Sequence, residues 1–141
     1  LLDFTPQSNQ TDISVALEFL SGVAKRHCTA FMMSDFYDRE SFLHPLTISN
    51  RKHDVVAIQV YDWWERRLPD VGLLKVRDAE SGYEQYIDTG SKKLRDLHQR
   101  NWNNRQASLH EVFTKSNVDN VSIATDEDYV KQLMMLFRKR N

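Results

Sequence analysis

The stretch TAFMMSD, residues 29–35, decides which fold class this sequence predicts. It is a short apolar run that ends in a serine and a carboxylate, Ser34 and Asp35. One amphipathic helix pattern precedes the run, and a polar turn followed by a second helix pattern comes after it. That order is typical of a buried strand in a parallel sheet, whose carboxyl end carries the polar pair.

The same pattern recurs twice along the chain. The apolar run at residues 55–61 is followed by Asp62, and the run at residues 121–125 is followed by Asp126. In open α/β sheets, ligands bind outside the carboxyl ends of the strands. The three strand-end aspartates therefore predict where a site lies more clearly than they predict what the site does.

The segments around the central run are predicted to be helical. Thr11 or Asp12 can N-cap a helix that continues to about Lys25, and its wide apolar stripe predicts a well-buried helix. Ser41 is a candidate cap for the helix that follows the apolar run at residues 29–35. Residues 62–69 are polar apart from Trp63, Trp64 and Leu68, and this pattern predicts a loop.

The second half contains a hairpin and two further helices. Extended runs at residues 73–76 and 83–87 flank turn residues that end in Gly82, which is a hairpin signal. Ser91 is expected to cap a long surface helix over residues 92–115, and Thr125 with Asp128 resembles a capping box for the last helix. Together these elements predict a three-layer α/β domain with a mostly parallel sheet, right-handed crossovers and an inserted β-hairpin.

Composition narrows the class of protein. At 141 residues the chain is expected to be one domain, and its formal net charge of −1 argues against binding to nucleic acid. No apolar run approaches the ~20 residues of a membrane span, and the N-terminus lacks a signal-peptide pattern. The single cysteine, Cys28, favours a reducing compartment and an inert thiol, so we expect a cytoplasmic protein. The absence of a start methionine suggests a fragment or a processed chain.

Two interpretations of the strand-end acids remain open. Asp35, Asp62 and Asp126 are suited to a hard cation such as Mg²⁺ if they converge, or each caps the segment that follows it. The five histidines lack zinc-ligand spacing and are expected at surface or cap positions. The pair Trp63 and Trp64 is either a partner contact or packing beneath its loop. A solvated helix face is expected for Lys92, Lys93, Arg95, Arg100 and Arg105.

Several of these motifs together resemble a known family. They are Thr11-Asp12-Ile13 with the helix that follows, Met33-Ser34-Asp35-Phe36, His53-Asp54-Val55-Val56-Ala57, Tyr61-Asp62, Leu68-Pro69-Asp70-Val71-Gly72, Arg77-Asp78-Ala79-Glu80-Ser81-Gly82 and Thr125-Asp126-Glu127-Asp128-Tyr129-Val130. The joint pattern covers nearly the whole chain and is similar to the bacterial family called domain of unknown function fifty-eight. That family resembles von Willebrand factor A domains, is often encoded beside MoxR-type AAA ATPases, and is not known as an enzyme family.

The resemblance also implies a partial metal site. A metal-ion-dependent adhesion site uses an Asp-x-Ser-x-Ser motif after the first strand, then a threonine and an aspartate, and Thr11 and Asp35 match the last two positions. The first motif does not occur in this chain. The resemblance therefore implies that residues 1–141 are the C-terminal part of a domain whose first three strands precede Leu1.

The leading hypothesis is therefore a non-enzymatic, intracellular protein-interaction module of von Willebrand A type. Thr11 and Asp35 would bind Mg²⁺ only in the full-length protein, and no cofactor is expected in this part alone. Ser34, Trp63 and Trp64 are candidate partner-binding residues, with a MoxR-type AAA ATPase as the candidate partner and a homodimer through an open strand edge as a second association. The alternative is a metal-dependent hydrolase or nuclease in which Asp35, Asp62 and Asp126 hold cations that activate water.

Overall fold

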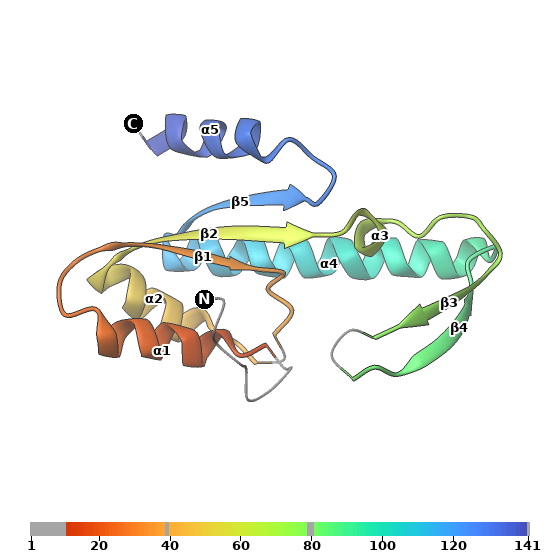
Figure 1. Cartoon of the computed structure of the whole chain (residues 1–141), viewed down its shortest axis with the longest axis horizontal. Coiled ribbons are helices and arrows are strands. Elements are labelled where there is room, and N and C mark those ends of the chain that lie inside the picture. Colours follow the sequence, from red (N-terminus) through yellow and green to blue (C-terminus); the bar gives the residue numbers. More distant parts are fainter. Residues whose placement is uncertain (1–10, 39, 79–80, 141) are drawn as a thin grey trace.

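A three-stranded parallel sheet forms the centre of the molecule (Figure 1). The computed structural model describes residues 11–38, 40–78 and 81–140. Strand β2 (Asp54–Tyr61) lies between β1 (Thr29–Ser34) and β5 (Asp119–Ala124) and is parallel to both. Within the described residues, β1 is hydrogen-bonded to β2 alone, so one edge of β1 is unpaired. The predicted α/β class and the mostly parallel sheet are confirmed.

Helices cover both faces of this sheet. Figure 1 shows α5 (Tyr129–Arg140) on one side, and α1 (Ile13–Val23), α2 (Leu43–Lys52) and α4 (Lys92–Ser116) on the other. Burial of both faces explains why residues 55–59 of β2 are all buried, whereas exposure alternates along β1. The structure is therefore the predicted three-layer arrangement.

The main core lies between the sheet and the three-helix layer. Val55 and Ala57 of β2 pack there against helical side chains, including Leu46, which has no exposed surface. The other members of this cluster are Ile13, Leu17, Phe36, Phe42, Leu109, Phe113 and Val118. On the opposite face, Phe137 of α5 meets Phe31 of β1 edge to face, with ring centroids 6.1 Å apart.

Ion pairs join α5 to the sheet and also form along the surface of α4. Arg140, in the last turn of α5, pairs with Asp54 and with Asp119, at the amino ends of β2 and β5. On α4, Lys115 donates a hydrogen bond to Glu111, and this bond, together with the lysine's charge, lowers the pKa of the Glu111 carboxyl group.

The hairpin forms a separate two-stranded antiparallel sheet, as predicted. Strands β3 (Leu73–Arg77) and β4 (Glu84–Asp88) pair with each other and not with the parallel sheet. Ser91 caps α4 by accepting a hydrogen bond from the backbone N–H of Leu94. Figure 1 shows the hairpin beside the first turns of α4, away from the parallel strands.

Four expectations about local structure are wrong. Residues 62–69 are not a continuous loop, because a short helix, α3 (Trp63–Arg66), begins directly after Asp62. The first helix is not buried all round: Val15, Phe19 and Val23 are 59%, 70% and 63% exposed, since its only extensive helix packing in the described structure is against α2.

The other two corrections concern helix caps. Ser41 does not cap α2, because the N-cap residue is Phe42 and no side chain accepts a capping hydrogen bond there. Thr125 forms no capping box, because Asp128 itself accepts hydrogen bonds from the backbone N–H groups of Val130 and Lys131. His53, which was expected at a surface or cap position, is the C-cap residue of α2. It is 1% exposed, and its Nδ1 lies 3.5 Å from the Cys28 Sγ, because the chain passes directly from α2 into the buried β2.

The unpaired edge of β1 predicts self-association. An apolar edge without charges or proline is a template for pairing with another chain, and Met33 is 70% exposed there. We expect the chain to form dimers by strand pairing or segment exchange, unless residues 1–5, which lie outside the described residues, cover the edge. Sedimentation at micromolar protein concentration measures the outcome.

Met33→Lys should shift the equilibrium toward monomer because an edge charge opposes pairing. Phe19→Lys, at an equally exposed apolar position on α1, is the control. If the protein is a monomer and residues 29–34 exchange their amide protons rapidly, then neither dimerisation nor a covered edge is correct.

Candidate functional site

The turn after β1 presents Asp35 at the rim of the sheet. Asp35 accepts a hydrogen bond at Oδ1 from the backbone N–H of Tyr37, at 3.1 Å, and the Ser34 hydroxyl accepts one from the N–H of Phe36, at 3.0 Å. Phe36 has φ of 56°, a left-handed conformation that is unfavourable for a bulky residue. Burial of its ring against Phe42 and Phe113 offsets this cost. The result is a fixed turn with an exposed carboxylate.

The start of α1 is joined to the same loop. Asp38 accepts a hydrogen bond at 2.9 Å from the backbone N–H of Ile13, the first residue of α1. Asp12 caps the helix by accepting from the N–H of Val15. Thr11 precedes the cap residue Asp12 and is thereby placed near the loop that contains Asp38.

The three strand-end aspartates do not form one acidic cluster. Among the residues that the structure describes, no group of three His, Cys, Asp or Glu side chains is placed to hold a metal ion. Asp62 instead caps α3, and Asp126 lies in the exposed turn before α5. Thr11 and Asp35 by themselves leave most of the octahedral shell of Mg²⁺ to other ligands.

Helix α3 fixes the two tryptophans in an exposed position. Asp62 accepts a hydrogen bond from the N–H of Trp64, and the Glu65 carboxylate accepts one from the N–H of Asp62, which completes a capping box. Trp63 and Trp64 are 41% and 51% exposed. The exposure of both rings favours a partner contact over packing beneath the loop.

Side chains of α4 hold α3 in place. His98 Nε2 lies 3.1 Å from the backbone carbonyl oxygen of Trp64, and Arg105 forms an ion pair with Glu65 at 3.1 Å. The Arg105 guanidinium also stacks on the rings of Tyr37 and Trp102, at 5.0 and 4.9 Å from their centroids. Arg105 thus connects the loop after β1 to the helix after β2.

The prediction of a wholly solvated basic face on α4 is wrong for two residues. Arg95 pairs with Asp70 and donates to the carbonyl oxygens of Thr89 and Gly90, and Arg105 is engaged as described above. One helical face of α4 carries Arg95, His98, Trp102 and Arg105, because they are spaced three or four residues apart. This spacing could have predicted from the sequence that the two arginines face the rest of the protein. Lys92, Lys93 and Arg100 are exposed, as predicted.

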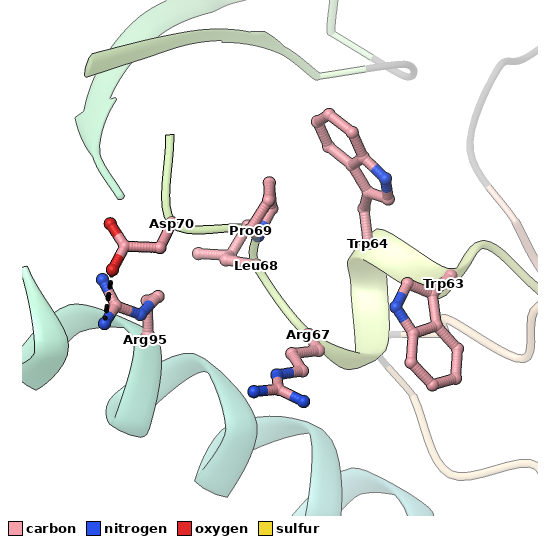
Figure 2. A pocket seen from close by; sticks show the side chains of 7 residues that line it. All are labelled: Trp63, Trp64, Arg67, Leu68, Pro69, Asp70 and Arg95. Carbon is pink, nitrogen blue, oxygen red and sulfur yellow. Dashed lines mark ion pairs between the residues drawn. The ribbon is translucent and has the colours of Figure 1, made fainter. Parts of the chain in front are cut away.

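A pocket of about 400 Å³ opens beside the tryptophans (Figure 2). Figure 2 shows Trp63 and Trp64 on α3, the Asp70–Arg95 ion pair at the far end, and Arg67 between them. Leu68 and Pro69 complete the lining. Within the described residues, Arg67 forms no ion pair, so its guanidinium is available to an anion.

Comparison with known proteins shows the family to which the chain belongs. Residues 1–108 match the family described as "Protein of unknown function DUF58", and the chain belongs to that family. No solved structure matches the chain. In the described residues, no helix is both long and apolar enough to cross a membrane.

Several proteins with a similar sequence come from mycobacteria. The chain is 30% identical over 137 residues to an uncharacterized protein of Mycobacterium bovis, covering 96% of this chain and 42% of that protein. An uncharacterized protein of Mycobacterium tuberculosis gives the same values. An uncharacterized protein of Mycobacterium avium is 25% identical over 135 residues, covering 96% of this chain and 79% of its own length. The chain thus spans less than half the length of the first two relatives.

We predict that residues 1–141 bind Mg²⁺ no more tightly than about millimolar, because two ligands leave most of the octahedral shell to water. Calorimetry measures the affinity, with Asp126→Ala as the control for Asp35→Ala. Micromolar binding lost in both variants would favour the hydrolase alternative.

The capping box yields a second prediction. Asp62→Ala should lower the free energy of unfolding by about 1 kcal/mol and release α3 from its fixed position. We expect acrylamide to quench tryptophan fluorescence more strongly in this variant. Asp12→Ala removes a similar cap from α1 and is the control: it should lower stability without increasing quenching. Equal quenching in both variants would mean that the cap does not hold the tryptophans.

Proposed function

We propose that the chain is part of a non-enzymatic protein-interaction module of von Willebrand A type that works in the cytoplasm. The observation that carries this proposal is the pair of exposed tryptophans, Trp63 and Trp64, held on a capped helix at the carboxyl end of the central strand. Tryptophan is enriched among the residues that dominate binding energy in protein interfaces. A rigid platform of this kind loses little conformational entropy on binding.

The position of Trp63 and Trp64, called the tryptophan platform below, supports the same proposal. Ligands of open α/β sheets bind at the carboxyl ends of the strands, and both Asp35 and the tryptophans lie at that end. Arg105 links the two segments, so a partner that contacts the tryptophans lies near Asp35 and Ser34 as well. The resemblance to the family makes a MoxR-type AAA ATPase the candidate partner.

Asp35 has a separate role in this proposal. Its Oδ2 forms no hydrogen bond within the described residues, so one exposed carboxylate oxygen remains available as a metal ligand. In the full-length protein, Asp35 and Thr11 would bind Mg²⁺ together with the Asp-x-Ser-x-Ser motif that this chain lacks. The bound cation would supply an open coordination position to a partner carboxylate.

Binding of the full-length protein to a MoxR-type AAA ATPase tests the proposal. Trp64→Ala should weaken binding by roughly tenfold or more, since truncation of a central interface tryptophan costs about 2 kcal/mol. Asp35→Ala should weaken binding in Mg²⁺ but not in EDTA. Calorimetry measures both effects.

Tyr86→Ala is the control, because Tyr86 is a 67% exposed aromatic residue on the hairpin strand β4. It should leave the affinity unchanged. Wild-type affinity of Trp64→Ala would exclude the tryptophan platform as the binding surface, and an equal effect of Tyr86→Ala would exclude a specific role for it.

A further inference from the structure

The pocket beside the tryptophans continues into a longer groove along α4. A second pocket, of about 300 Å³, is lined by Tyr37, Glu65, His98, Asn101, Trp102 and Arg105. A third, of about 270 Å³, lies between α4 and the hairpin. The third pocket shares Leu68 with the first, and His98 and Asn101 with the second, so the three are contiguous.

The chemistry of the groove alternates along its length. Its middle section is mainly apolar, with Leu68, Val76, Ile87, Leu94 and Leu97 in the lining. The two flanking sections combine aromatic rings with guanidinium groups. Such a surface matches an extended chain that places apolar and charged side chains in succession.

The charges in the lining of the groove indicate whether its ligand is an anion or a cation. Arg95 is neutralised by Asp70, and Arg105 by Glu65. Arg67 has no acidic partner within the described residues and leaves the groove positive, although the chain as a whole carries a net charge of −1. The section of the groove that contains Arg67 therefore offers an unpaired donor to an anion.

We infer that this groove binds an extended acidic segment of a partner protein, with a carboxylate at Arg67 and an adjoining apolar side chain against Trp64. This inference rests on the proposed function and adds the chemical class of the ligand. A nucleic acid strand is the less favoured occupant, because one unpaired guanidinium does not match a phosphate at every nucleotide. An acidic peptide needs only occasional anionic contacts and uses the apolar section between them.

Fluorescence anisotropy with labelled peptides tests the inference on the purified full-length protein. One peptide alternates Glu with Leu and Pro, a second has Lys in place of every Glu, and a thymidine oligonucleotide is the third probe. We expect the Glu peptide to bind about tenfold more tightly than the Lys peptide, because a carboxylate accepts a charge-assisted hydrogen bond from Arg67 whereas an ammonium group is repelled by it. Arg67→Glu should abolish this preference.

Arg51→Glu is the matched control, because it makes the same charge change at an exposed position in the last turn of α2. It should keep the preference for the Glu peptide. Equal affinity for the two peptides, an equal effect of Arg51→Glu, or tighter binding of the oligonucleotide would overturn the inference.

These outcomes are separable from those of the proposed function. If Trp64→Ala abolishes ATPase binding while the protein shows no charge preference, the interaction surface stands and the acidic ligand is excluded. If the protein prefers the Glu peptide but Trp64→Ala binds the ATPase normally, the groove stands as an acidic-peptide site and the ATPase proposal fails.

Discussion

The burial of β2 on both faces is the constraint on which the rest of this structure depends. Residues 55–59 are buried between the three-helix layer and α5, and they hydrogen-bond to β1 on one side and β5 on the other. Each fully buried aliphatic side chain contributes about 1.5–3 kcal/mol. Because β2 is central, the loops after β1 and β2 meet at one edge, and that is where the exposed acid and the tryptophans lie.

A buried polar residue aligns that edge. Gln59, which is 1% exposed, accepts a hydrogen bond at 2.8 Å from the Ser122 hydroxyl of β5. Its amide nitrogen lies 3.5 Å from the backbone carbonyl oxygen of Asp35. One side chain thus spans the carboxyl ends of all three strands. Arg105 makes the corresponding connection on the outside of the sheet, between Tyr37 and Glu65.

Local patterns predicted much of the secondary structure because the forces involved act over a few residues. Apolar runs of strand length predicted β1, β2 and β5, and Ser91 predicted the start of α4. The loop prediction for residues 62–69 was wrong because α3 has four residues, too few to show a helical period. Its capping box, Asp62 with Glu65, was the signal that the polar character of the segment obscured.

The sequence by itself determined the α/β class, the family, and the edge of the sheet at which polar side chains gather, since periodicity and strand-end chemistry are local properties of the chain. Only the tertiary structure decided which of those side chains act together. It separated the three aspartates, exposed the tryptophans, and brought Arg105 of α4 against Tyr37 and Glu65. These contacts join residues far apart in sequence, and their partners depend on how the helices pack across the sheet. No spacing along the chain encodes that packing.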